Sequence, residues 1–311
     1  MRRFPVVLLS GALLMGTALA ACGDDSGSSS ATTGGGAATT GGGAATTAGG
    51  GSSASGLTVK ASEYNFDVTG DAAGGFNNVT FENDGKEPHI LVAIKLQPGK
   101  TVADALPLLA QEGEPDPAAV AAVFDGDPGA AFYGTPGLLA PGDSETTVAD
   151  FPAGNYAFVC FLPSPEGQPH FTLGMAKDFT VADSGGTSTP PETDGTITIA
   201  ADKITAPDGM KSGTYEVKNT GTDPSDFNMA GPTDKQVSDF DDAINAYFAT
   251  IGTGETKPLS VPAPLVGGFS DTIPPGKSGY VVVDLEKGRY IMGGSSDENG
   301  NTHVVGEFEV S

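Results

Sequence analysis

One series of landmarks occurs twice along the chain, and this repeat limits the fold more than any other feature of the sequence. In both copies the glycine of a Pro-Gly pair is followed twelve residues later by the glycine of a Gly-x-Tyr motif. Four landmarks in the same order, at a nearly constant offset, argue for a duplication rather than chance. The matched segments are 83–89 and 219–225, 100–104 and 235–239, 141–142 and 275–276, and 154–156 and 288–290.

The apolar residues of each half follow the two-residue period of β-strands. Apolar and polar residues alternate in the segments 57–61 and 79–81, and every second residue of 156–160 is predicted to lie on one face. The nearly continuous apolar run 90–96 predicts a buried strand, which we expect to be central in its sandwich. Glycine and proline are abundant, with 46 and 23 residues, which favours turns and short strands.

Short helical insertions are predicted between these strands. Thr101 and Asp104 have the spacing of a capping box, and Asp116 is followed by a proline, as at the start of many helices. Pro107 is expected to kink or shorten the first helix, and the second half has a matching helical stretch at 237–248. The fold class that follows is all-β, with two tandem Greek-key β-sandwich domains, each with a short helical insertion.

The N-terminus has the features of an export signal. Two arginines precede the apolar segment 6–14, which is too short for a comfortable membrane span, and Leu19-Ala20-Ala21-Cys22 follows it. This ending resembles the lipobox of bacterial lipoproteins, which implies lipidation of Cys22 and a position at the outer face of the cytoplasmic membrane of a bacterium. An ordinary signal peptide with a chance cysteine is the alternative. The predicted segments are a lipoprotein signal peptide (1–21), a low-complexity Gly/Ala/Thr/Ser tether (22–56), a first domain (57–183), a linker (184–195) and a second domain (196–311).

Charge and cysteine content narrow the possible functions. The formal net charge is −24, from 15 basic and 39 acidic residues, so the chain repels nucleic acid, which we do not expect as a partner. The chain has two cysteines, and lipidation of Cys22 leaves Cys160 without a disulfide partner within the chain. A lone thiol in an oxidising compartment is a liability unless it is buried or held by a metal.

Potential metal ligands surround this second cysteine in the sequence. The motif Gly-x-Tyr-x-Phe-x-Cys ends at Cys160, Pro-His-x-x-x-Gly-Met follows and ends at Met175, and Asn-x-x-x-x-Pro-His ends at His89. Over residues 57–182 these motifs resemble the copper-ligand loops of plastocyanin-like cupredoxins. The resemblance implies one type 1 copper ion in the first domain, held by His89, Cys160, His170 and Met175. Such a site has two imidazoles and a thiolate in a trigonal arrangement, with a weak axial thioether.

Each proposed ligand taken alone has an ordinary structural explanation, and two features depart from the family pattern. His89 alone fits a hydrogen-bonded loop residue, and Cys160 or Met175 alone fits a core position. The interval from Cys160 to His170 is longer than in plastocyanin, and Ile90 stands where the family usually has an asparagine that braces the loop. We therefore expect a distorted, greenish site.

The second half lacks the ligand set. Ser225 falls at the position of His89, and Gly294 falls at the position of Cys160. His303 falls near the position of His170, but no methionine follows it at the required spacing. We therefore predict a degenerate second domain without copper ligands, in which His303 is structural or exposed to solvent.

The leading functional hypothesis is one-electron transfer with a redox protein partner. His170 is expected nearest the surface, in an apolar docking patch formed by Phe161, Leu162, Phe171 and Leu173. The alternatives are copper sequestration or delivery, and a metal-free structural or interaction module on a cupredoxin fold. Multicopper oxidases and nitrite reductases need a second copper centre built mostly from histidines, and this chain has three histidines, so we predict that it is not an enzyme.

Overall fold

The computed structural model describes residues 56–311 apart from 112, 129–130, 255–257 and 296–302. The predicted signal peptide, the lipidated Cys22 and the tether up to residue 55 lie outside the described residues. Within the described part of the chain, no helix has the length and apolar character needed to cross a membrane.

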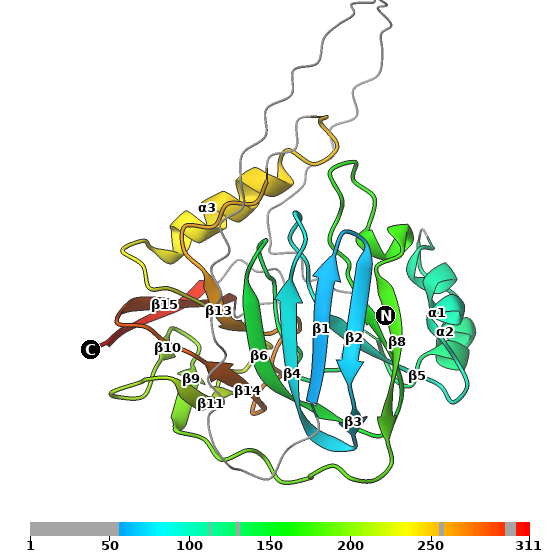
Figure 1. Ribbon diagram of the computed structural model, residues 1–311, viewed down its shortest axis with the longest axis horizontal. Helices are drawn as coiled ribbons and strands as arrows, with labels where there is room; N and C mark the ends of the chain where they lie inside the picture. The colour runs from blue at the N-terminus through cyan, green and yellow to red at the C-terminus, as the bar shows by residue number, and fades with distance from the viewer. Residues whose placement is uncertain (1–55, 112, 129–130, 255–257, 296–302) are drawn as a thin grey trace, which may run out of the picture. The chain divides into compact units, whose positions relative to one another are not determined.

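The described chain is mostly β-structure, and the predicted fold class is confirmed (Figure 1). Each half forms a sandwich of two sheets, and one sheet of each half joins an eight-stranded sheet with the order β10-β9-β11-β14-β6-β4-β1-β2. The other sheets have the orders β3-β8-β7-β5 and β13-β12-β15-β16. The strands of the first half are β1 (Gly56–Ser62), β2 (Asn65–Gly70), β3 (Ala72–Ala73), β4 (Gly75–Asn83), β5 (Val92–Leu96), β6 (Ser144–Phe151), β7 (Gly154–Val159) and β8 (Ala176–Ala182). Those of the second half are β9 (Gly195–Ile199), β10 (Ile204–Thr205), β11 (Gly213–Asn219), β12 (Asn228–Ala230), β13 (Leu265–Gly268), β14 (Ser278–Val283), β15 (Gly288–Ser295) and β16 (His303–Val310).

The two halves have matching strand pairings. In the first half β1 pairs in parallel with β4, and β4 pairs antiparallel with β6. In the second half β9 pairs in parallel with β11, and β11 pairs antiparallel with β14. The antiparallel series β5-β7-β8 corresponds in the same way to β12-β15-β16. The pairings therefore place the landmarks of the sequence repeat at corresponding points of both sandwiches.

Alternating burial explains why these segments are strands. In β1 the side chains of Leu57, Val59 and Ala61 are buried while their neighbours are half-buried or exposed. In β7 the side chains of Tyr156 and Phe158 pack in the same cluster as Cys160, so the predicted shared face is confirmed. One face of each strand thus builds the space between the sheets.

The expectation that 90–96 is a central strand is wrong. The strand β5 lies at the edge of its sheet, next to β7. It is apolar throughout because both of its faces are covered: Ala93 packs in the main core, and Ile94 packs in a second cluster with Ala105 and Phe124 of the helical insertion. When helices cover the outer face of an edge strand, its sequence is apolar throughout, like that of a central strand.

The helical insertions lie where the sequence predicts them. The first half has α1 (Val102–Leu109), with Pro107 inside it, and α2 (Pro117–Val123). The Asp104 carboxylate accepts a hydrogen bond from the backbone N–H of Thr101 at 3.0 Å, as in a capping box. The second half has α3 (Val237–Phe248). All three begin at the predicted caps or stretches.

The two halves are in direct contact. Strands β6 and β14 pair antiparallel through Thr146 with Val282 and Thr147 with Val281. The rings of Phe132 and Phe269 meet edge to face, with centroids 5.4 Å apart. This contact continues one sheet across both halves, so the first sandwich has the second as a fixed neighbour.

Candidate metal centre

Three of the four predicted ligands lie in loops at one end of the first sandwich. His89 lies between β4 and β5, where its backbone pairs with Leu139 through hydrogen bonds of 3.1 and 2.9 Å. Cys160 directly follows β7, and His170 begins the 3₁₀ helix η1 (His170–Leu173). A backbone hydrogen bond of 2.8 Å from His170 to Leu162 folds the long loop back on itself. Residues from two distant parts of the chain thus meet only in the folded protein.

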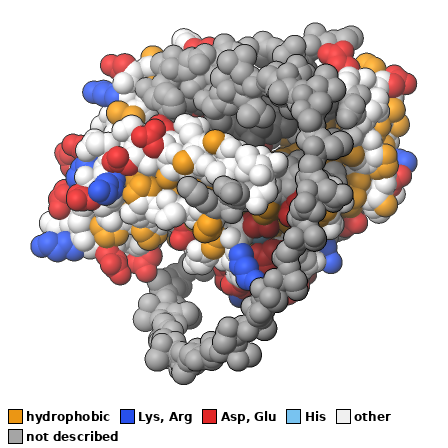
Figure 2. Space-filling model, turned by 90° about the horizontal axis from the view of Figure 1, so that it is seen from above, with side chains coloured by type: hydrophobic (Ala, Val, Ile, Leu, Met, Phe, Trp, Pro, Cys, Tyr) orange, Lys and Arg blue, Asp and Glu red, His pale blue; other side chains and the backbone are white. Residues whose placement is uncertain are grey.

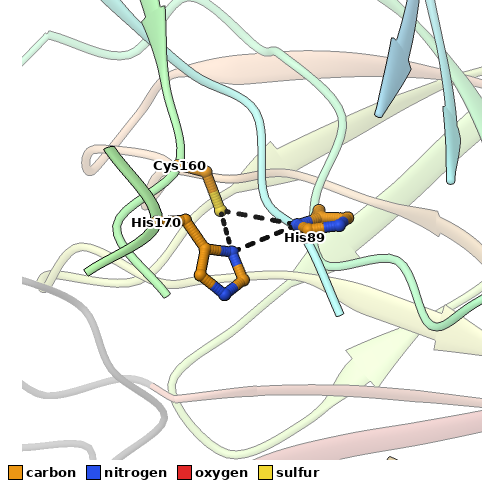
Figure 3. A group of neighbouring side chains, drawn as sticks. All are labelled: His89, Cys160 and His170. Atoms are coloured by element: carbon orange, nitrogen blue, oxygen red, sulfur yellow. Dashed lines mark hydrogen bonds between the residues drawn. The ribbon is translucent and has the colours of Figure 1, made fainter. Parts of the chain in front are cut away.

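The side chains of His89, Cys160 and His170 converge on one point (Figure 3). The Nδ1 atoms of the two histidines are 3.2 Å apart. The Sγ atom of Cys160 lies 3.4 Å from Nδ1 of His170 and 4.0 Å from Nδ1 of His89. All three side chains are fully buried. Two imidazoles and a thiol therefore face one another without access to solvent.

Met175 lies beside this group, as predicted. Its carbonyl oxygen accepts a hydrogen bond from the backbone N–H of Cys160 at 3.1 Å, and its own N–H donates to the carbonyl of His170 at 3.0 Å. Its side chain is fully buried and packs in the same cluster as Cys160. The structure therefore brings all four predicted residues together.

Burial sets the protonation state of these side chains. It lowers the pKa of His89 to about 3, with help from the neighbouring His170, and lowers that of His170 to about 4. It raises the pKa of the Cys160 thiol to about 12, which the backbone N–H groups of Ile90 and Leu162 partly offset. Both imidazoles are thus neutral, as metal ligands must be, and the thiol needs a bound cation to lose its proton.

An asparagine braces the loop that carries His89. The Asn83 amide nitrogen donates to the carbonyls of Glu87 at 2.8 Å and Leu139 at 3.1 Å, and its Oδ1 atom accepts from the N–H of Gly85 at 2.9 Å. A side chain at Gly85 would press on Nε2 of His89, so glycine is needed for this close approach. The bracing asparagine thus precedes the histidine and does not occupy the position of Ile90.

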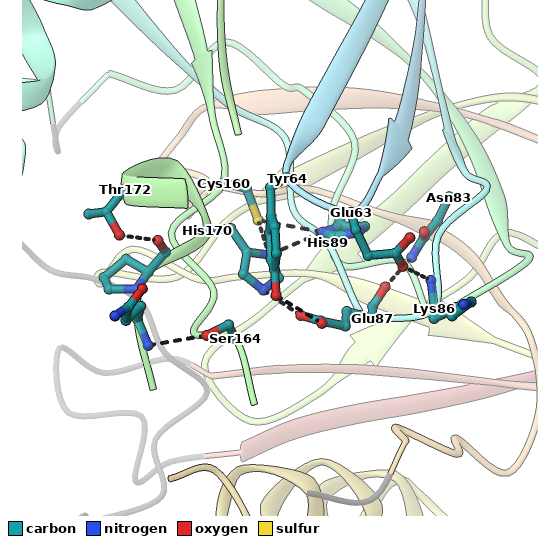
Figure 4. Close-up of polar contacts among 12 residues, drawn as sticks. Glu63, Tyr64, Asn83, Lys86, Glu87, His89, Cys160, Ser164, His170 and Thr172 are labelled. Atoms are coloured by element: carbon teal, nitrogen blue, oxygen red, sulfur yellow. Dashed lines mark hydrogen bonds and ion pairs between the residues drawn. The ribbon is translucent and has the colours of Figure 1, made fainter. Parts of the chain in front are cut away.

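The outer edge of His170 is enclosed by residues that the sequence did not single out (Figure 4). Its Nε2 atom lies 2.9 Å from Oε2 of Glu87, at ion-pair distance but without hydrogen-bond alignment. The Tyr64 hydroxyl donates to Oε1 of Glu87 at 3.1 Å, and the Tyr64 and His170 rings meet edge to face at 5.2 Å. Glu87 lies two residues before His89, so the only sequence signal for it was proximity to a ligand.

The predicted docking patch is therefore wrong. His170 is fully buried rather than nearest the surface, and Leu162 and Phe171 are buried as well. Phe161 and Leu173 are half-buried. Glu87 and Tyr64 cover the outer edge of His170, and the second half also contacts the ligand loop: after α3, the N–H of Gly252 donates to the carbonyl of Pro165 at 2.8 Å.

The corresponding end of the second half has a matching backbone bridge, and its described residues do not repeat the ligand group. Ser225 pairs with Ile273 as His89 pairs with Leu139, and its hydroxyl donates to the carbonyl of Asp226 at 3.0 Å. Gly294 lies at the position of Cys160, and a methyl group there would overlap the carbonyl of Asp226. His303 begins β16, and its side chain lies outside the described residues.

Comparisons with known proteins match this chain to solved structures. No family model matches the sequence, and no curated protein sequence matches it. A dithionite-reduced auracyanin from the photosynthetic bacterium Roseiflexus castenholzii is 26% identical over 42% of this chain and 99% of its own, with a TM-score of 0.28. A multicopper oxidase is 18% identical over 82% of this chain and 88% of its own, with a TM-score of 0.23. The copper nitrite reductase from Nitrosomonas europaea is 10% identical over 82% of this chain and 93% of its own, with a TM-score of 0.21.

The chain folds as two joined β-sandwiches, which is the all-β fold class that the sequence predicted. The prediction that it is not an enzyme is contradicted, because the structures it resembles include multicopper oxidases and copper nitrite reductases, which are enzymes. The histidine count was too narrow an argument. It limits the ligands that one chain supplies by itself, and it does not limit the ligands that another chain adds.

Proposed function

We propose that this chain is an exported, lipid-anchored electron-transfer protein with one type 1 copper ion in its first domain. The ligands would be His89, Cys160 and His170, with Met175 as the weak axial donor. The observation that carries the proposal is the buried convergence of two Nδ1 atoms and one Sγ atom, all within 4.0 Å of one another. This donor set, with a thioether beside it, is the one that blue-copper sites use.

The residues present fit a copper ion. The two imidazoles are neutral and the thiol is shielded from solvent, so the site favours a soft cation that takes the thiol proton's place. Bound copper would supply a one-electron couple between Cu(I) and Cu(II). The chain's own residues hold the ligands in place: Asn83 braces the loop of His89, and two backbone hydrogen bonds join Met175 to Cys160 and His170.

The position of the protein in the cell is part of the same proposal. We place it at the outer face of a bacterial cytoplasmic membrane, with lipid on Cys22, a tether to residue 56 and domains at 57–183 and 196–311 joined by a linker. Its partner would be a redox protein. Acidic side chains are spread over the face drawn in Figure 2, and for this reason we do not propose nucleic acid as a partner. Cys22→Ser should release the protein from membranes, and unchanged partitioning would contradict the anchor.

Copper sequestration is the second candidate, and the complete burial of His170 favours it. Cyclic voltammetry of the copper-loaded full chain separates the two functions. Electron transfer requires a reversible one-electron wave, with Cys160→Ser as the control that lacks it. Copper held as Cu(I) without a reversible wave would replace electron transfer by sequestration, and a chain that retains no copper would contradict both.

A further inference from the structure

The outer nitrogen of His170 is held by a chain of polar contacts. Its Nε2 atom faces the Glu87 carboxylate at 2.9 Å, and the other oxygen of that carboxylate accepts a hydrogen bond from Tyr64 at 3.1 Å. The Glu87 side chain is 15% exposed, and His170 is fully buried. The imidazole therefore has polar neighbours on both sides, the ligand group at Nδ1 and the Glu87 carboxylate at Nε2.

Tyr64 reaches this position from a strained turn. It is the second residue of the two-residue turn between β1 and β2, and its φ is 60°, in the left-handed region that favours glycine or asparagine. Such a conformation is unfavourable for a bulky residue, because its Cβ atom comes too close to the following carbonyl. The turn also lies against the ligand loop, because a side chain at Gly174 would press on the carbonyl of Tyr64. A tyrosine kept at such a site indicates that its side chain is needed there.

The second half closes the remaining side. Its helix α3 contributes Phe240, Ile244 and Tyr247 to the hydrophobic cluster that contains Cys160 and Met175. Tyr247 is 3% exposed. Burial raises the pKa of its hydroxyl, and the Glu87 carboxylate, Cys160 and Tyr64 raise it further.

Unsatisfied polar atoms mark the same place. Oε2 of Glu87, Nε2 of His170 and the Tyr247 hydroxyl are buried and have no hydrogen-bond partner within the described residues. Buried polar atoms are rarely left so, and the Glu87 and His170 atoms lie 2.9 Å apart beside the ligand group. The second half thus contributes a residue with a buried, unpaired hydroxyl to the cluster that contains Cys160 and Met175.

We propose that α3 of the second half is the cap of the copper site, with Tyr247 closing the outer edge of His170 together with Glu87 and Tyr64. The cap keeps solvent and foreign ligands away from Cys160 and His170. This assigns a role to the half that has no ligands of its own. The proposal rests on the proposed function, because that function makes the covered residues copper ligands. The covering of Cys160 and His170 by α3 can be tested in the chain without metal.

The test measures how fast a thiol reagent modifies Cys160 in the metal-free full chain. A Cys22→Ser background leaves Cys160 as the only thiol. Tyr247→Ala and Ile244→Ala each remove part of the cap and should speed the reaction at least about tenfold, which corresponds to about 1.4 kcal/mol of local opening. Ile197→Ala is the control, because Ile197 is fully buried in the other cluster of the same half.

The control removes the effect of general destabilisation. The free energy of unfolding of each variant is measured first, and rates are compared at matched stability. Acceleration in the two α3 variants but not in Ile197→Ala supports the cap, and equal rates in all three contradict it. Tyr247→Phe keeps the ring and should stay within about twofold of the parent. A rate equal to that of Tyr247→Ala would show that the ring is not the cover.

The copper-loaded chain gives a second readout. In the α3 variants, added imidazole should change the visible spectrum of bound Cu(II), and it should leave the parent and Ile197→Ala unchanged. An imidazole effect of equal size in the parent would contradict the cap. If the chain binds no copper but Cys160 reacts faster in the α3 variants than in Ile197→Ala, the proposed function is refuted and the cap is supported. If the chain binds copper but Cys160 reacts equally fast in all variants, the cap is refuted and the proposed function is supported.

Discussion

The two halves use the same brace at their loop ends. In the first half the Asn83 amide donates to the carbonyls of Glu87 and Leu139, and Oδ1 accepts from Gly85. In the second half the Asn219 amide donates to the carbonyls of Asp223 and Ile273, both at 2.8 Å, and Oδ1 accepts from Gly221 at 2.8 Å. The scaffold that presents His89 therefore also presents Ser225.

The halves differ in the space behind this brace. Cys160 is fully buried and has room for its sulfur, whereas the backbone carbonyl of Asp226 fills the corresponding space beside Gly294. The second half has therefore lost the room for a ligand as well as the ligands. Its helix α3 packs instead over the ligand end of the first half. The comparison teaches that one sandwich can keep the frame of a metal site and serve as a cover for another.

We expect the largest effect on copper affinity when a proposed ligand is removed from the first half. His89→Ala should lower copper affinity by more than the 10–100-fold that is typical for loss of an outer partner, because a ligand itself is lost. Ser225→Ala, at the corresponding position, should leave affinity unchanged. Competition with a copper chelator measures both. Equal losses in the two variants would show that the halves do not differ in metal binding.

The next effect concerns the filled space in the second half. Gly294→Ala should lower the free energy of unfolding by about 1–3 kcal/mol, since the added methyl group overlaps a backbone carbonyl that cannot easily move. Gly56→Ala is the matched control, because a methyl group there meets the carbonyl of Asn78 at an ordinary 3.5 Å. Urea unfolding followed by circular dichroism measures both. A neutral Gly294→Ala would mean that the space is open and that only the ligands were lost.

The two halves also differ at a buried carboxyl group, which should make the stability of the protein depend on pH. Glu145 is buried next to the contact between the halves, where Gly279 takes the corresponding place in β14. Burial raises the pKa of Glu145 to about 8, and the N–H of Gly137 at 3.3 Å offsets this only in part. The folded protein therefore holds a proton that the unfolded chain loses above its ordinary pKa near 4.5. Stability contributed by this proton is present below that value and is lost as the pH rises toward 8.

Glu145→Gln should remove this loss. Within that pH window each unit costs about 1.4 kcal/mol per group. Asp271, whose pKa burial raises to about 7, contributes a loss of the same sign, so Glu145→Gln should flatten the profile in part, and adding Asp271→Asn should flatten it further. Glu309→Gln, at an exposed position, is the control. Urea midpoints from pH 5 to pH 8 that fall equally in parent and Glu145→Gln would refute the burial argument.

The smallest effect is expected from the axial position. Met175→Leu keeps the volume of the side chain and removes a weak donor, so copper should stay bound. The reduction potential should rise by about 59 mV for each tenfold gain in the preference for Cu(I) over Cu(II), and we expect about one such step. Met229→Leu, in the core of the second half, is the control. A potential that does not move would remove Met175 from the site.

Local sequence patterns predicted most of the fold because the relevant forces act between near neighbours. Alternation predicted β1 and β7, cap residues predicted α1 and α2, and the sequence repeat predicted α3. The edge position of β5 was missed because the covering of its outer face by helices is a tertiary contact. Sequence does not show which side of a strand an insertion will cover.

In the candidate site, too, the sequence predicted what depends on local motifs and missed what depends on tertiary contacts. The four predicted ligands were found because each residue type carries metal chemistry at a recognisable spacing. Glu87, Tyr64 and Tyr247 were missed because they act from three separate segments and meet only in the folded chain. The error about an exposed His170 has the same cause, since the residues that cover it come from distant parts of the sequence.

The visible absorption spectrum of the full chain loaded with Cu(II), measured beside Cys160→Ser, tests the central claim most directly. We predict one copper per chain and an intense visible band that arises from charge transfer between the Cys160 thiolate and the metal. The Cys160→Ser chain should lose that band and keep the far-ultraviolet circular dichroism of the folded parent. A parent that binds no stoichiometric copper, or a band that survives in Cys160→Ser, would contradict the account.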